Sequence, residues 1–211
     1  MSQRIVPALV AVVAVAIVWL GFALWEATSR RRLKSLAQAW SRYAQERRMR
    51  LISIAELARR ASDPGATSSD PGPSIVHGEV LGVEIDVTVE RTATRPRTKV
   101  EATLPGVAPE FVMVIQRRDG IHIFPERGLS EARTGNKAFD AAYTLLSNEP
   151  DLARSILDRR LAQVVLGFPR GFSELCAHGK KFVLSWQGME TQPEVLDAAI
   201  EVVFTACRRR A

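Results

Sequence analysis

VEIDVTVE, residues 83–90, is the stretch that decides the fold, because apolar and polar side chains alternate along its whole length. Successive side chains of a strand point to opposite faces of a sheet, so the pattern predicts a strand with one buried face. Val100, Ala102 and Leu104 repeat the alternation, and the continuous apolar run at 111–115 is typical of a central strand. We therefore expect an antiparallel sheet.

Two tight turns are predicted between strands. Asp119-Gly120 separates QRR from IHIF, and glycine readily takes the positive φ that a two-residue hairpin turn requires. His178-Gly179 lies between apolar alternation at Leu175 and Ala177 and further alternation at 182–186, which predicts a second hairpin.

The pattern changes to helical spacing in the C-terminal half. Residues 149–166 carry apolar side chains at three- and four-residue intervals, with Pro150 in the first turn and Gly167 after the end. A second helix is expected from Thr191-Gln-Pro-Glu194 onward, with Cys207 on its apolar face. The predicted class is α+β: an antiparallel meander sheet covered by these two helices, within one domain at 74–211.

Residues 5–25 form an uncharged apolar run after a short tail at 1–4. A helix of this length spans a bilayer core of about 30 Å, so the run predicts a transmembrane helix. The cations that follow it predict, by the positive-inside rule, a single-pass protein of a bacterial inner (cytoplasmic) membrane with its C-terminal domain in the cytoplasm. The alternative orientation places the domain outside.

The basic character of the chain, +6 in all, is confined to one segment. Residues 26–62 hold ten Arg and Lys against three Glu, whereas 63–211 hold eighteen against twenty acidic residues. The globular part therefore lacks the charge of a nucleic-acid binder, and no nucleic acid is expected as a partner. The expected partner of the basic segment is the bilayer with its anionic headgroups, contacted by Arg30, Arg31, Arg32, Lys34 and Arg42.

The basic segment at 26–62 is also predicted to be helical, mainly at 29–48, with an apolar stripe along one side. Such a stripe could lie on the bilayer, pack on the domain or pair with a second copy, so a protein partner or a homo-oligomer is possible. Residues 63–73, DPGATSSDPGP, break all periodicity and predict a linker.

No motif in the chain commits it to a chemistry. Phosphate-binding glycine loops, CxxC zinc pairs, HExxH and GxSxG are all lacking from the sequence. Cys176-Ala-His178 offers two metal donors, which cannot close a zinc site, and Cys207 is expected to be a small buried hydrophobe. Whether the two cysteines pair is left open. We predict no catalytic, cofactor-binding or metal-binding residue.

The remaining polar candidates are interpreted as structural. His77 and His122 are expected at the surface, and Asp140 is expected to hydrogen-bond nearby backbone in a glycine-containing turn. The carboxylates of the first strands are predicted to form the wet side of the sheet, namely Glu79, Glu84, Asp86 and Glu90.

Several short motifs resemble a broad group of uncharacterised bacterial membrane-anchored proteins that contain a domain of unknown function. They are GEVLG at 78–82, Leu104-Pro105, TGNKAFDAAY at 134–143 and NEPD at 148–151, with Asn136 where the group usually has Asp. The resemblance covers about residues 30–205. It implies a fold and an anchored location, and it transfers no catalytic residue.

The leading hypothesis is a binding or scaffolding module, because a sheet with helices offers surfaces and the sequence offers no reaction centre. The alternatives are a membrane-tethered enzyme of unrecognised type and, if the topology is reversed, an envelope-facing module. A cavity with convergent polar groups of perturbed pKa would favour the enzyme.

Overall fold

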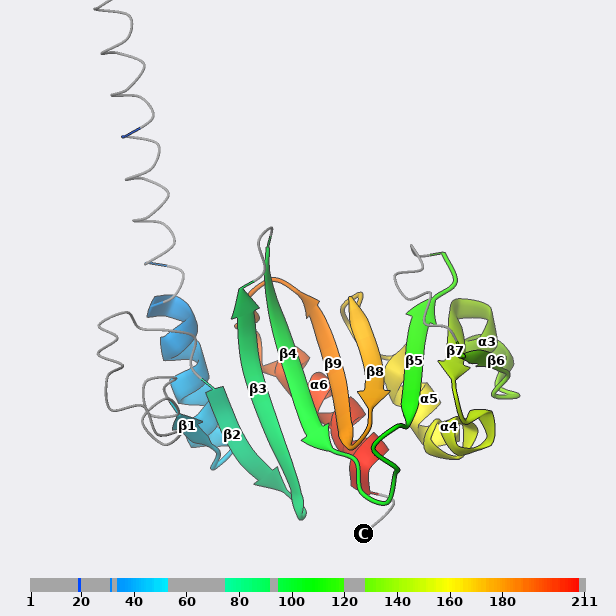
Figure 1. Cartoon of the computed structure of the whole chain (residues 1–211). Helices are drawn as coiled ribbons and strands as arrows, with labels where there is room; N and C mark the ends of the chain where they lie inside the picture. Colours follow the sequence, from blue (N-terminus) through cyan, green and yellow to red (C-terminus); the bar gives the residue numbers. More distant parts are fainter. Residues whose placement is uncertain are drawn as a thin grey trace, which may run out of the picture. The chain divides into compact units, whose positions relative to one another are not determined.

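The structure, a computed structural model, describes Trp19, Arg31 and residues 34–52, 75–91, 95–119 and 128–208. The chain divides into two compact units, Met1–Gln38 and Ala39–Ala211. In the first unit, residues 34–38 are helical. The second unit is built on a nine-stranded antiparallel sheet with the order β1-β2-β3-β4-β9-β8-β5-β7-β6 (Figure 1).

The first four strands follow one another along the chain and across the sheet. They are β1 (Arg50–Ile52), β2 (Ile75–Val80), β3 (Val83–Arg91) and β4 (Pro96–Thr103). The alternation at 83–90 forms β3 as predicted, with Ile85, Val87 and Val89 buried.

The second half of the sheet is not a meander, which corrects the predicted topology. The hairpin of β8 (Glu174–His178) and β9 (Lys181–Gln187) lies between β4 and β5 (Val112–Arg117), and β7 (Tyr143–Ser147) and β6 (Ser130–Ala132) complete the sheet. The predicted turn at His178-Gly179 is confirmed as the β8–β9 connection. In this position β9 pairs with β4 over its full length, and β8 pairs with β5.

Four labelled helices accompany the sheet: α3 (Lys137–Ala142), α4 (Pro150–Ile156), α5 (Arg159–Leu166) and α6 (Pro193–Cys207). The single helix predicted at 149–166 is two helices, because Asp158 starts a new one. The Asp158 carboxylate accepts a hydrogen bond from the Leu161 backbone N–H at 2.8 Å and thereby caps α5. The last helix forms where it was predicted.

The sheet has one face covered by helices. Figure 1 shows α6 behind β4 and β9, and α5 behind β8 and β5. A row of side chains from six adjacent strands is buried on this helix face: Val87, Val100, Leu184, Leu175, Ile115 and Leu145. The opposite face, turned toward the viewer, is called the front face; no described helix is drawn over its central strands.

Helical residues 39–46 pack on α6 within the second unit. Trp40 Nε1 donates to the Glu190 carbonyl at 2.8 Å, and the Tyr43 hydroxyl donates to Asp197 at 2.7 Å. Arg47 adds an ion pair to Asp197. These contacts lie within the compact unit Ala39–Ala211, where the apolar stripe of this helical segment covers α6.

The prediction of a transmembrane helix is not supported by the structure. Residues 5–25 lie, Trp19 excepted, outside the described residues, and the described part of the chain holds no helix with the length and apolar character needed to cross a bilayer. The prediction of a single-pass protein in a bacterial inner membrane rested on this helix, so it is not supported either. The predicted linker at 63–73 also lies outside the described residues.

Candidate functional site: an arginine-lined notch

A notch opens in the sheet because β8 is shorter than its neighbours. Its first residue, Glu174, pairs with Ser185, whereas β9 continues to Gln187 and β5 continues to Arg117. The ends of β9 and β5 thus flank a gap beyond the start of β8. Segment 170–173, which leads from α5 into β8, forms the remaining wall, and the gap is a cavity of about 420 Å³.

Three arginines from separate parts of the chain line this notch: Arg97 on β4, Arg117 on β5 and Arg170 before β8. Arg117 donates to both carboxylate oxygens of Asp119 at 2.9 Å, and Arg170 lies 3.3 Å from Glu190. Within the described residues no partner is found for the half-buried Arg97. Ion pairs therefore account for the placement of Arg117 and Arg170, whereas the described part of the chain supplies no counter-charge for Arg97.

The walls of the notch are partly aromatic. Phe172 stacks on Tyr143 with ring centroids 5.2 Å apart, and Trp186 meets Phe168 edge to face at 5.5 Å. Rings held by such neighbours keep one orientation, so they present fixed apolar surface to the cavity. Small-molecule sites combine apolar walls with a few oriented polar groups in this way.

A polar row on the front face borders the notch. Ser185 and Glu174 are paired across β9 and β8, and Gln116 follows one position beyond the pair Ile115–Leu175. Ser185 Oγ and Gln116 Oε1 are buried and have no hydrogen-bond partner within the described part of the chain. Burying an unpaired polar atom costs roughly 1–3 kcal/mol.

Glu190 fixes the helix-face side of the notch. This buried carboxylate accepts hydrogen bonds from the backbone N–H groups of Thr191 and Gln192, both at 3.0 Å, and from Trp186 Nε1 at 3.3 Å. Glu190 therefore links the residues that lead into α6 to β9, and it forms an ion pair with Arg170. Glu190 thus positions this wall of the notch, and its negative charge is paired with Arg170.

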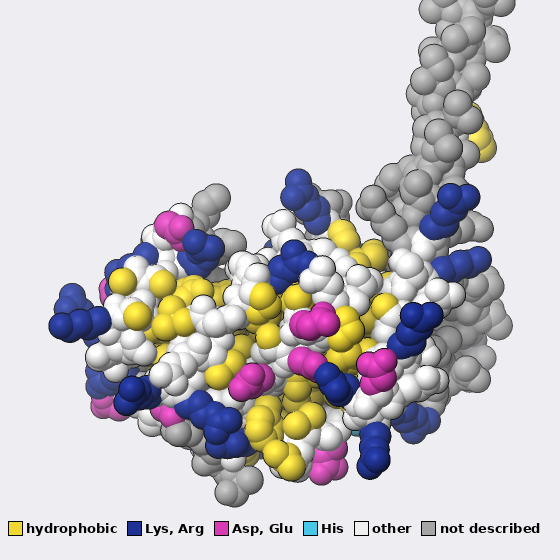
Figure 2. Space-filling view, turned by 180° about the vertical axis from the view of Figure 1, so that it is seen from behind, with side chains coloured by type: hydrophobic (Ala, Val, Ile, Leu, Met, Phe, Trp, Pro, Cys, Tyr) yellow, Lys and Arg dark blue, Asp and Glu magenta, His cyan; other side chains and the backbone are white. Residues whose placement is uncertain are grey.

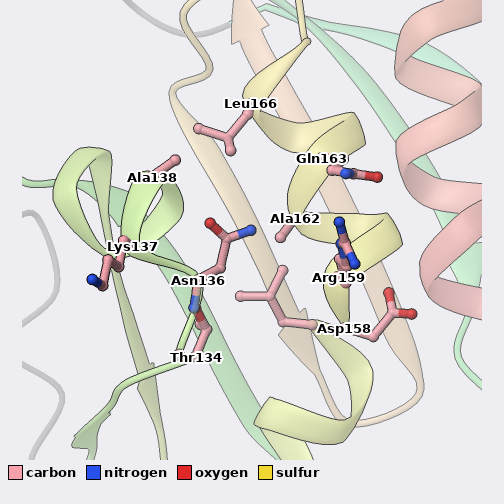
Figure 3. Close-up of a pocket in the computed structure, with 11 residues that line it drawn as sticks. Thr134, Asn136, Lys137, Ala138, Asp158, Arg159, Ala162, Gln163 and Leu166 are labelled. Carbon is pink, nitrogen blue, oxygen red and sulfur yellow. The ribbon is translucent and has the colours of Figure 1, made fainter.

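A second cavity, of about 550 Å³, lies between the turn before α3 and α5 (Figure 3). Its polar lining is largely engaged in folding, because Asn136 caps α3 through the Phe139 N–H and Asp158 caps α5. Lys137 points away from α5 in this view. The cations of this cavity, Lys137 and Arg159, are exposed, whereas Arg97 of the notch is half-buried, so the notch is the stronger candidate for ligand binding.

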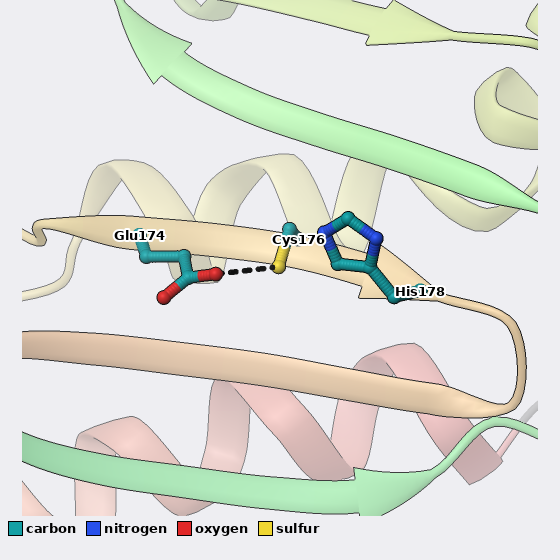
Figure 4. A group of neighbouring side chains, drawn as sticks. All are labelled: Glu174, Cys176 and His178. Atoms are coloured by element: carbon teal, nitrogen blue, oxygen red, sulfur yellow. Dashed lines mark hydrogen bonds between the residues drawn. The ribbon is translucent and has the colours of Figure 1, made fainter. Parts of the chain in front are cut away.

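A group of metal-ligand types lies on β8. Glu174, Cys176 and His178 carry donor atoms that all lie within 4.8 Å of one another, and Figure 4 shows them in a row along the strand. The Cys176 thiol donates to Glu174 Oε1 at 3.2 Å. The sequence indicates Cys176 and His178 as an incomplete pair of ligands, and the structure adds Glu174 as a third donor.

The predicted membrane-contact residues are only partly described. Arg31, Lys34 and Arg42 are exposed, while Arg30 and Arg32 lie outside the described residues, so their contact with anionic headgroups stays a prediction. Seen from the helix side, Lys and Arg are interspersed with Asp and Glu (Figure 2).

The carboxylates of the first strands and His77 have structural surroundings. Glu79, Glu84 and Glu90 are exposed, as expected for a wet face. His77 is half-buried, and its Nδ1 lies 2.7 Å from Asp86 Oδ1, because the two residues pair across β2 and β3. His122 lies outside the described residues.

The predicted backbone hydrogen bonds of Asp140 and the predicted burial of Cys207 are confirmed. Asp140 accepts hydrogen bonds from the Thr134 backbone N–H at 3.1 Å, the Thr134 hydroxyl at 2.8 Å and the Gly135 N–H at 3.2 Å. Cys207 is 1% exposed on α6, and burial raises the pKa of its thiol to about 12. Neither cysteine forms a disulfide.

The sequence did not reveal the three arginines of the notch. They lie on β4, on β5 and in the segment before β8, so no local spacing connects them. The group on β8 did have a local signal, because positions 174, 176 and 178 share one face of any strand that contains them.

Comparison with known proteins adds a fold. No protein-family model matches the chain, and no curated protein sequence matches it. Among solved structures, it is similar to the crystal structure of the mycobacterial trehalose monomycolate transport factor A, TtfA. The TM-score is 0.56 at 15% identity, over 82% of this chain and 94% of that one. At this identity the likeness shows that the two chains share a fold.

Proposed function

We propose that residues 39–211 form a binding module whose notch recognises a small organic anion, with a carboxylate or phosphate head and an apolar body. The observation that carries the proposal is Arg97, a half-buried cation that lines the cavity beside two further arginines. Guanidinium groups bind carboxylate and phosphate through two parallel hydrogen bonds. Phe172 and Trp186 supply apolar contact for the rest of the ligand.

The lining of the notch favours binding over catalysis. Arginine stays protonated near neutral pH, so three arginines bind and orient an anion but do not exchange protons with it. Glu174 is the one carboxylate among the lining residues, and its Oε1 accepts the Cys176 thiol. The similar structure, TtfA, is named as a transport factor, which is consistent with a binding or scaffolding role for this fold.

The test uses phenyl phosphate as an anionic probe and benzyl alcohol as a neutral probe with the same ring. Calorimetric titration of the full chain is expected to show binding of phenyl phosphate that weakens with added salt, and none of benzyl alcohol. Arg97→Gln should weaken phenyl phosphate at least about tenfold, because a hydrogen-bonded charge contributes roughly 1.5–3 kcal/mol.

The matched control is Arg160→Gln, which removes the same charge from an exposed position on α5 outside the notch. This variant should bind the probe as the parent does. Equal affinity of the Arg97 and Arg160 variants, equal binding of the two probes, or no binding of phenyl phosphate would each overturn the proposal.

A further inference from the structure

Strand β8 presents three different metal-donor types on one face. Side chains two residues apart on a strand point to the same side, so Glu174, Cys176 and His178 project together from the front face. The register agrees, because Cys176 pairs with Val114 and Val183, whose side chains cluster with it.

We propose that these three residues form a binding site for a thiolate-preferring divalent cation, of which Zn²⁺ is the natural example. Catalytic-type zinc sites use three protein ligands drawn from Cys, His and carboxylate, and leave one position to water or another ligand. The set on β8 matches that count and chemistry. A soft sulfur donor disfavours Mg²⁺ and Ca²⁺, which prefer oxygen ligands.

The distances allow the three donors to close on one ion. Tetrahedral zinc with ligand bonds of about 2.0–2.3 Å holds its donor atoms roughly 3.5 Å apart. Cys176 Sγ and Glu174 Oε1 are already 3.2 Å apart, and all three donors lie within 4.8 Å. His178 is exposed, so its imidazole can move the remaining distance, on the order of 1 Å, by side-chain rotation.

The surroundings favour an ion at this position. Cys176 is 0% exposed, and Val112, Leu129 and Leu146 pack around its cluster, so the sulfur faces an apolar shell. Such a shell excludes water and strengthens the attraction between a thiolate and a cation. On binding, the thiol proton passes to the solvent, and the metal takes the place of that proton beside Glu174.

The nearby lysine does not occupy the site. Lys181 pairs with His178 across the hairpin, yet its Nζ bonds Glu101 Oε1 at 3.1 Å. Glu174 therefore keeps its carboxylate for the thiol and the ion. The site adjoins the proposed anion site, because Glu174 also lines the notch, whereas Cys176 and His178 do not.

The experiment titrates Co²⁺, a spectroscopic substitute for Zn²⁺, into the chelator-treated full chain without a polyhistidine tag. One equivalent should produce a near-ultraviolet sulfur-to-cobalt charge-transfer band, and Zn²⁺ should displace it. Cys176→Ser should abolish the band. His178→Ala should weaken Co²⁺ at least about tenfold, because lost metal-site groups typically cost 10–100-fold.

Cys207→Ser is the matched control, since Cys207 is the second cysteine of the chain and lies buried on α6. This variant should keep the full band. Circular dichroism of each variant separates loss of the site from unfolding, and the exposed His178 gives a variant that leaves the core intact. A band that survives Cys176→Ser, a band lost in Cys207→Ser, or no band with the folded parent would overturn the proposal.

Discussion

The two faces of the sheet use their side chains differently. On the helix face, an apolar row runs from Val87 to Leu145 across six strands, and every member is buried under helices or neighbouring strands. On the front face, the corresponding rows mix valines with Cys176, Glu174, Ser185 and Gln116, and two of these polar groups are buried without a hydrogen bond in the described residues. Burial of apolar area explains the first face, whereas the polar groups of the second contribute little to folding.

The largest difference is expected at adjacent residues of β7. Leu145 is 1% exposed on the helix face, and Leu146 is half-buried on the front face. Leu145→Ala should lower the free energy of unfolding by about 2–5 kcal/mol, through lost burial and a cavity, and Leu146→Ala by about 1 kcal/mol. Denaturant titration of both variants measures the ratio. Similar losses for the two variants would remove the distinction between the faces.

Glu190 tests how the helix face holds the wall of the notch. Glu190→Ala leaves the backbone N–H groups of Thr191 and Gln192, just before α6, and the Trp186 indole N–H without their acceptor. We expect a loss of about 2–3 kcal/mol, because buried donors remain unpaired. The measurement is urea unfolding followed by tryptophan fluorescence. Arg170→Gln, which keeps the backbone contacts of Glu190, is the milder control; equal losses would show that the ion pair dominates instead.

The smallest effect on stability is expected from Glu101, which forms ion pairs with Lys99 and Lys181 on the front face. Partial burial raises the pKa of Glu101, but hydrogen bonds and charge from both lysines outweigh it and leave the pKa below its usual range. A lowered folded-state pKa contributes stability above the unfolded-state value of about 4.3, and the contribution disappears as the pH falls through the folded-state pKa.

Glu101→Gln should therefore cost about 1 kcal/mol at pH 7 and nothing in strong acid. Unfolding of parent and variant between pH 2 and about pH 7 gives the comparison. Curves that stay parallel down to low pH would show that the ionised carboxylate is not the source of the difference.

Local patterns predicted most of the strands but not their order. The alternation at 83–90 and around His178-Gly179 set β3 and the β8–β9 hairpin, because each strand buries one face. The insertion of that hairpin between β4 and β5 depends on pairing between distant segments, which has no local signal. The single helix predicted at 149–166 failed at Asp158, whose carboxylate caps α5 from within the apolar pattern.

The candidate site was predictable only where its residues share one strand. Period-two spacing along one strand relates Glu174, Cys176 and His178. The sequence analysis considered only Cys176 and His178 as metal donors. Arg97, Arg117 and Arg170 meet only because β8 starts late and leaves the ends of β5 and β9 apart. Such a vacancy in a sheet follows from strand register, which one sequence does not specify across distant segments.

The central claim is that the notch binds an organic anion, and a crystal structure of the full chain with 4-bromophenyl phosphate tests it most directly. Bromine scatters anomalously, so its position is located independently of the refined model of the ligand. The account predicts a bromine peak beside Phe172 and Trp186, with the phosphate bonded to Arg97. A ligand found elsewhere, or a notch that stays filled by solvent at saturating probe, would contradict it.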